Sequence, residues 1–303
     1  MSEVRFLSPR PRILKLKSPL TLKFNRTSAI ILLAMELQDF IKSSLTEASK
    51  IALDKFGEVK GVSKGADNNQ VLTEADLAIG KFLVGEIKKF YPKHNVIDEE
   101  AGVIDNKSDY TWVIDPVDGT SNFASGSPIF GIILGLLYKD QPLAGGVSLP
   151  FFSEIYTAEK GKGAFCNGEK LQVTKEPELL KTLIGYGIDG HQEDPRLTQE
   201  ECALLAEIIL NIRNLRSSGC VFDGMMVAKG KYGGYHHRNT NVWDVVGMQI
   251  ILEEAGGVFT DFFGNPIDYS NHLQRFDEHY PFCTAPPQLH KKLQEIIQRH
   301  KIS

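Results

Sequence analysis

Apolar residues recur every three to four positions over residues 36–56, and Gly57 ends this pattern. Such spacing predicts an amphipathic helix with one buried face. A second helix is expected to begin at Thr73, where Thr-Glu-Ala-Asp resembles a capping box, and to run to about Phe90. The polar residues 61–70 between the two helices predict a loop or a hairpin.

The pattern then changes to short apolar runs separated by Gly, Pro, Asp or Asn, which is typical of strands. Runs of this kind cover residues 95–97, 111–114, 129–138, 143–149 and 154–158. Asn167-Gly168 is a strong turn dipeptide and predicts a hairpin within residues 165–173.

Strands and helices alternate beyond Pro177. Strands are expected at 182–187, 232–236 and 258–260, and helices at 197–212, 219–229, 243–255 and 287–299. This order predicts an α/β (α+β) fold with a seam near residues 175–182. The expected units are a basic extension over 1–34, an N-terminal α+β metal-binding half over 35–178 and a C-terminal α/β half over 179–303.

The composition, 42% hydrophobic and 24% charged, is that of an ordinary globular protein. No stretch approaches the roughly 18 to 20 continuous apolar residues that a membrane-spanning helix requires. Residues 1–34 carry seven Lys or Arg against one Glu, a net charge of +6, which leaves −10 for the rest of the chain. An acidic body repels nucleic acid and attracts divalent cations, so we expect no nucleic-acid partner. The lack of a long apolar stretch predicts no membrane partner.

Three interpretations of the basic segment 1–34 are open. It could be a transit-type targeting peptide, a secretory signal, or simply a disordered extension or sequence upstream of a true start at Met35. We expect the disordered extension and a cytoplasmic protein, and we do not exclude a targeting peptide.

The cysteines lie far apart in the sequence, with no C-x-x-C spacing. They are Cys166, Cys202, Cys220 and Cys283. This spacing predicts neither a zinc site nor a disulfide framework. We expect reduced, buried thiols.

The densest chemical feature is the segment 112–123, WVIDPVDGTSNF, in which an apolar strand ends in Asp115 and Asp118. Thr120 and Ser121 then offer hydroxyl groups and amide hydrogens that could bind a phosphate. Hard cations such as Mg²⁺ prefer oxygen ligands, which two carboxylates and a backbone carbonyl supply. The alternative is a plain solvated Asp-Gly turn, which the length of the whole string disfavours.

Two other segments bring acids to the ends of apolar elements. Asp98, Glu99 and Glu100 follow an apolar strand, and Asp244 follows Trp243 at the start of an apolar helix. Taken alone, the first would be a solvated strand end and the second a carboxylate that interacts with the helix dipole. Together with the first pair they indicate a cation site, because clustered carboxylates repel one another unless a cation compensates their charge.

Three acid-bearing segments of these shapes, in this order, resemble the inositol monophosphatase family, a group of lithium-sensitive, magnesium-dependent phosphatases. The resemblance runs from about Leu37 to the C-terminus. The matching motifs are Asp115 to Phe123, Glu99-Glu100, Trp243-Asp244, residues 254–257 and Gly161 to Gly168. The resemblance implies a layered α-β-α-β-α sandwich of the inositol monophosphatase and fructose-1,6-bisphosphatase type. It also implies a small phosphorylated metabolite as substrate and a homodimer.

The resemblance further implies two to three Mg²⁺ ions. One would be held by Glu99, Asp115 and the carbonyl of Val117, and a second by Asp115, Asp118 and Asp244. Thr120 and Glu99 would orient and deprotonate the attacking water, while the second ion neutralises the leaving oxygen.

The remaining roles follow from the same resemblance. Asp76 would hydrogen-bond the catalytic Thr120, in addition to its role in the predicted capping box, and Lys64 would lie nearby. The predicted substrate-binding residues are Gly119, Thr120, Ser121, Ser217, His237 and Asp244.

Substrate choice in this family depends on the segment before the Trp-Asp motif. Inositol-selective members usually carry an acid seven residues before the Trp-Asp aspartate, and here that position is His237, followed by Arg238. These residues could bind a second anionic group of the substrate or lie in a solvated loop.

We therefore predict a magnesium-dependent phosphomonoesterase acting on inositol monophosphate or a related small sugar or polyol phosphate. The alternatives are fructose 1,6-bisphosphate, histidinol phosphate or a nucleotide 3′-phosphate as substrate, or a metal-binding protein without catalytic activity.

Overall fold

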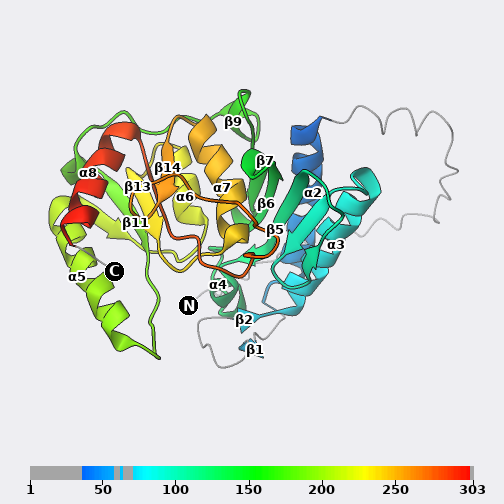
Figure 1. Cartoon of the computed structure of the whole chain (residues 1–303), viewed down its shortest axis with the longest axis horizontal. Helices are drawn as coiled ribbons and strands as arrows, with labels where there is room; N and C mark the ends of the chain where they lie inside the picture. Colours follow the sequence, from blue (N-terminus) through cyan, green and yellow to red (C-terminus); the bar gives the residue numbers. More distant parts are fainter. Residues whose placement is uncertain (1–35, 58–61, 64–70, 301–303) are drawn as a thin grey trace, which may run out of the picture. The chain divides into compact units, whose positions relative to one another are not determined.

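Two large β-sheets, a two-stranded hairpin and three layers of helices make up the described chain in the computed structural model (Figure 1). The structure describes residues 36–57, 62–63 and 71–300. The predicted basic extension over 1–34 and Lys64 lie outside these residues.

The larger sheet has eight strands in the order β10-β9-β8-β7-β6-β5-β3-β4. Their bounds are β3 Asn95–Asp98, β4 Gly102–Ile104, β5 Tyr110–Asp118, β6 Gly131–Tyr138, β7 Gln141–Leu149, β8 Glu154–Glu159, β9 Gly163–Cys166 and β10 Glu169–Lys170. Only β3 and β5 are parallel within this sheet. The carboxyl ends of these two strands therefore lie side by side.

Helices α2 (Leu37–Lys55) and α3 (Glu74–Phe90) cover one face of this sheet (Figure 1). Both were predicted within two residues of their observed ends. The predicted capping box at Thr73 is also confirmed, because its hydroxyl accepts a hydrogen bond from the amide of Ala75 while the side chain of Asp76 accepts one from the amide of Thr73. Strands β1 (Val62–Ser63) and β2 (Val71–Leu72) pair as an antiparallel hairpin.

The smaller sheet has five strands in the order β12-β11-β13-β15-β14. Their bounds are β11 Leu183–Gly187, β12 Asn214–Arg216, β13 Gly234–His237, β14 Val258–Asp261 and β15 Phe282–Ala285. Strand β11 is parallel to both of its neighbours, β12 and β13. The seam predicted near 175–182 falls between the last strand of the larger sheet and the first strand of the smaller one.

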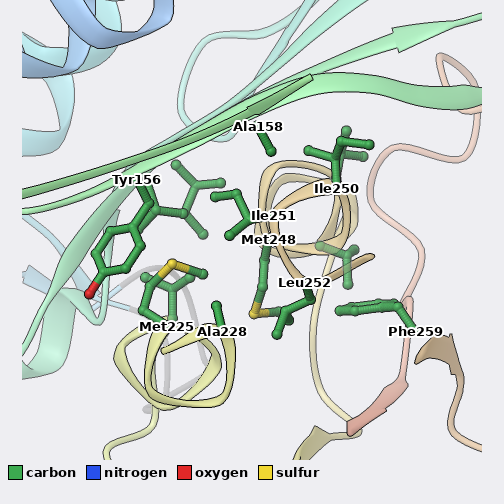
Figure 2. Packing of buried hydrophobic residues seen from close by; sticks show 14 of the residues in the cluster. Tyr156, Ala158, Met225, Ala228, Met248, Ile250, Ile251, Leu252 and Phe259 are labelled. Carbon is green, nitrogen blue, oxygen red and sulfur yellow. The ribbon is translucent and has the colours of Figure 1, made fainter. Parts of the chain in front are cut away.

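Helices α6 (Phe222–Ala228) and α7 (Val242–Glu254) pack between the two sheets. Figure 2 shows Met248, Ile250, Ile251 and Leu252 of α7 among side chains of strand β8, helix α6 and strand β14. A helix that is apolar on all sides is stable only when it is enclosed. Its position between the sheets satisfies this requirement.

The described chain has three further α-helices, α4 Thr120–Ala124, α5 Pro195–Asn211 and α8 Pro287–Arg299, and two short 3-10 helices, η1 Pro150–Phe152 and η2 Leu179–Lys181. Helix α8 packs on β15 of the smaller sheet and also contacts α5. The layers are therefore α2 and α3, the larger sheet, α6 and α7, the smaller sheet, and α5 with α8. This order is the predicted α-β-α-β-α sandwich.

The sequence pattern missed strands β4, β12 and β15. Strands β4 and β12 have only three residues each, and the four residues of β15 do not alternate between apolar and polar, so none of the three carries a recognisable strand pattern. The expectation of four buried thiols was also wrong, because Cys202 is exposed on α5 whereas the other three free cysteines are buried. No helix in the described residues is long and apolar enough to cross a membrane.

Helix α7 approaches the larger sheet closely at Gly247. A Cβ atom at this position would lie 2.7 Å from Cγ2 of Ile133 and 3.1 Å from the carbonyl oxygen of Leu134. The helix carries a glycine here because backbone lies directly below it. This contact determines how closely α7 packs on the larger sheet.

Gly247→Ala should therefore destabilise the protein by about 1–3 kcal/mol, since overpacking outweighs the better helix propensity of alanine. Gly85→Ala in α3 is the matched control, because a Cβ there meets nothing within 4 Å. It should stabilise the protein by about 0.5–1 kcal/mol. Urea unfolding of both variants measures the difference, and equal shifts would show that the contact at Gly247 is not tight.

Candidate active site

Three carboxylates from two distant segments meet between the sheets. Ligand oxygens of Asp115, Asp118 and Asp244 all lie within 4.8 Å of one another. The first two come from the end of β5, and Asp244 lies in the first turn of α7. The packing of α7 between the sheets thus brings its N-terminus against the end of β5.

An irregularity in strand pairing lets both β5 carboxylates point the same way. Asp115 pairs with Ile133 and Asp118 with Gly131, so β5 has one residue more than β6 over this stretch. In a regular strand, side chains three residues apart point to opposite faces. The extra residue, as in a β-bulge, places Asp115 and Asp118 on one face.

A backbone amide fixes each of these carboxylates. The amide of Val117 donates to Oδ1 of Asp115 at 3.0 Å, and the amide of Asn241 donates to Oδ2 of Asp244 at 2.6 Å. The amide of Val221 donates to Oδ2 of Asp118. The orientation of the cluster is thus set by the main chain.

The electrostatics of the cluster favour a bound cation. Burial raises the pKa of Asp115 well above its ordinary value, and the charges of Glu99 and Asp118 raise it further. Burial and the charge of Asp244 likewise raise the pKa of Asp118. One buried and two half-buried carboxylates with their oxygens this close together fit a hard divalent cation such as Mg²⁺, which would compensate their charge.

Glu99 and Val117 lie at the edge of the cluster. Glu99 follows β3, and its amide donates to the carbonyl of Ile114 in the parallel strand β5 at 3.2 Å. Its oxygens are outside the group that lies within 4.8 Å, although its charge acts on Asp115. Both residues line the same pocket as the three aspartates.

Thr120 lies between the cluster and helix α3. Its hydroxyl is 2.8 Å from the carbonyl oxygen of Val117 and 3.3 Å from Oδ1 of Asp76. The other oxygen of Asp76 accepts a hydrogen bond from the amide of Thr73 at 2.8 Å, so one carboxylate both caps α3 and contacts Thr120. Burial raises the pKa of Asp76.

The turn after β5 depends on a glycine. Gly119 has φ +87°, and a Cβ atom there would lie 2.9 Å from Cβ of Cys220. A side chain at this position would be strained and would also collide with the neighbouring loop. Gly119, Thr120 and Ser121 all line the pocket.

A pocket of about 290 Å³ joins this cluster to the smaller sheet. Ser218 and Gly219 line it, whereas the predicted Ser217 does not. Two hydrogen bonds hold Ser218 in this position. Its amide donates to Asp223 at 2.8 Å, and its carbonyl accepts from Asn122 at 2.9 Å. The structure thus places Ser218, and not Ser217, on the wall of the pocket.

His237 lies in strand β13 and is buried, so the interpretation as a solvated loop was wrong for this residue. Its Nε2 is 3.0 Å from Oδ2 of Asp189, which also accepts a hydrogen bond from Asn239 at 3.3 Å. Arg238 instead lies over the ring of Phe262, 5.4 Å from its centroid, and does not line the pocket.

Asp189 and Asn239 line the pocket, and neither was predicted from the sequence. Asp189 follows β11, and Asn239 follows the parallel strand β13. Ligand sites in such sheets form outside the carboxyl ends of parallel strands. An acid two residues after the strand predicted at 182–187 was the signal that could have identified Asp189.

Comparison with known proteins agrees with this geometry. The model of the inositol monophosphatase family matches residues 33–301. Human inositol monophosphatase 1 is 31% identical over 239 residues, which cover 77% of this chain and 86% of the human protein. The fructose-1,6-bisphosphatase/inositol-1-monophosphatase of Aquifex aeolicus is 30% identical over 76% of this chain and 87% of its own length.

The fold comparison gives the same result. The solved structure of the Thermotoga maritima IMPase superposes with a TM-score of 0.76 at 27% identity, covering 88% of this chain and 98% of that one. The predicted fold class is thereby confirmed. The chain belongs to the inositol monophosphatase family and is a phosphomonoesterase.

Proposed function

We propose that the chain hydrolyses the monophosphate ester of inositol or a related small polyol or sugar, with Mg²⁺ bound at the carboxylate cluster. The observation that carries this proposal is the meeting of Asp115, Asp118 and Asp244 within 4.8 Å at a pocket that Thr120 also lines. The family assignment supports it, because the relatives are phosphatases by name.

The acidic residues would hold two to three Mg²⁺ ions, with Glu99 and the carbonyl of Val117 as further ligands beside the three aspartates. When bound, such ions act as Lewis acids that lower the pKa of water and stabilise charge on phosphate oxygens. Their donor set is all oxygen, as Mg²⁺ requires.

Thr120 and Glu99 would prepare the water for attack. The hydroxyl hydrogen of Thr120 is directed to either Val117 or Asp76, so an oxygen lone pair is left to accept a hydrogen bond from water. Glu99, at the edge of the cluster, would take the proton. The water would then be aligned with the ester bond for in-line displacement.

The turn after β5 would bind the phosphate. The first amide groups of a helix have no acceptor within that helix, and α4 begins at Thr120. The amides of Gly119, Thr120 and Ser121 would therefore donate to phosphate oxygens. Asp244 and His237 would contact the alcohol part of the substrate.

Fructose 1,6-bisphosphate is the second candidate substrate. The Aquifex aeolicus relative carries both activities in its name, fructose-1,6-bisphosphatase and inositol-1-monophosphatase. A substrate panel separates the two. A homodimeric state, sensitivity to lithium and a cytoplasmic location stay predictions.

Phosphate release from the metal-free full-length chain tests the proposal. We expect turnover of inositol 1-phosphate that appears on addition of Mg²⁺ and disappears with excess chelator. Fructose 1,6-bisphosphate, histidinol phosphate and adenosine 3′,5′-bisphosphate complete the panel. Release that continues unchanged in chelator would contradict the proposal, and Mg²⁺ binding by calorimetry without turnover of any ester would favour a protein without catalytic activity.

A further inference from the structure

The pocket wall formed by the smaller sheet carries a further acidic side chain, Asp189, in addition to the carboxylate cluster. The parallel pairing of β11 with β13 places Gly187 opposite His237, and Asp189 follows two residues later. The ring of His237 lies directly over Gly187, where a Cβ atom would be 2.4 Å from the ring. The position of the Asp189–His237 pair is therefore set by the smaller sheet.

Asp189 is held in its charged form. Burial by itself would raise the pKa of Asp189, but hydrogen bonds from His237 and Asn239 outweigh burial and lower the pKa below its ordinary value. Both of these contacts are made to Oδ2. A carboxylate has two oxygens that can accept hydrogen bonds, so Oδ1 can accept another.

The charged side chains that line the pocket also favour an uncharged or cationic group of the substrate beside Asp189. Among the described residues, neither Lys nor Arg lines the pocket, and His237 is the one basic side chain there. It already pairs with Asp189, and Arg238 lies over Phe262 instead. A second phosphate on the substrate would therefore meet a carboxylate and no free cation on this wall.

We propose that Asp189, positioned by His237, is a specificity-determining residue of this phosphatase: its carboxylate accepts hydrogen bonds from the alcohol part of the substrate and disfavours a second phosphate. The preferred substrates are monophosphates whose alcohol carries hydrogen-bond donors, hydroxyl or ammonium groups. This inference rests on the proposed function. A hydrogen bond from the substrate to a half-buried carboxylate discriminates between substrates, because a substrate without the donor covers the acceptor and leaves it unpaired.

The test compares three monophosphates in the Mg²⁺-loaded full-length enzyme: inositol 1-phosphate with hydroxyl groups, histidinol phosphate with an ammonium group, and p-nitrophenyl phosphate with neither. Asp189→Asn should lower kcat/KM for the preferred donor-bearing ester by about 10- to 100-fold, chiefly through a higher KM. Turnover of p-nitrophenyl phosphate should change less than about threefold, since that ester makes no such bond. Turnover of fructose 1,6-bisphosphate should stay equal or rise.

The control is Glu193→Gln, which removes one negative charge from an exposed position in the same loop and should change none of these ratios. An equal loss for all esters in Asp189→Asn would overturn the inference, because it would indicate a purely structural role. Unchanged discrimination would overturn it as well. If the unaltered enzyme hydrolyses none of these esters with Mg²⁺, the proposed function itself fails.

Discussion

Asp115→Asn should leave a folded protein whose kcat/KM is lower by about 1,000-fold or more. Asp115 is buried, accepts a hydrogen bond from Val117 and lies in contact range of the other two aspartates. An amide of the same shape keeps this packing but removes the charge that would hold a cation. Phosphate release from inositol 1-phosphate at saturating Mg²⁺ measures the loss.

The matched control is Asp109→Asn, at an exposed aspartate just before β5 that pairs with Lys139 at 3.6 Å. This variant should keep its activity within about twofold, because exposed ion pairs contribute little. Without metal, Asp115→Asn should melt at the same temperature as the unaltered protein or higher, since repulsion within the cluster is reduced. Full activity in Asp115→Asn would show that the carboxylate cluster takes no part in the reaction.

Thr120→Ala should lower kcat by about 100- to 10,000-fold, the range that general acid–base catalysis contributes. The hydroxyl lies 2.8 Å from the carbonyl oxygen of Val117 and 3.3 Å from Asp76, and alanine removes both contacts. Thr120→Ser keeps the hydroxyl and should recover most of the activity. Single-turnover phosphate release measures both variants.

Thr46→Ala is the control for the two Thr120 variants. The hydroxyl of Thr46 donates to the carbonyl of Lys42 on the exposed side of α2. We expect no change in kcat for this control. If serine at position 120 is as inactive as alanine, the methyl group rather than the hydroxyl is what the site requires. That result would contradict the proposed role of Thr120.

Much of the fold follows from the sequence because long periodic segments carry enough signal. Both N-terminal helices, the hairpin at Asn167-Gly168 and the buried helix α7 were predicted close to their observed positions. Strand β15 was missed, since its four buried residues, FCTA, do not alternate between apolar and polar. Short buried strands are defined by their neighbours in the sheet, which a local pattern does not contain.

The acids of the candidate site were also visible in the sequence, because each lies at one end of an apolar element. Their convergence, however, depends on the extra residue in β5 and on the insertion of α7 between the sheets. The Asp189–His237 pair depends on the parallel register of β11 and β13, so the sequence indicated His237 without its partner. Tertiary pairing, and not local propensity, decides which charges meet.

The position of helix α7 lets a bound ion stabilise the tertiary structure. The helix packs on both sheets, and its first turn presents Asp244 to the end of β5. An ion held by Asp244 and Asp115 would join two points that are far apart in the chain, and would act as a reversible cross-link between helix α7 and strand β5. Because such a ligand binds the folded chain and not the unfolded one, the free energy of unfolding would rise with the concentration of the ion.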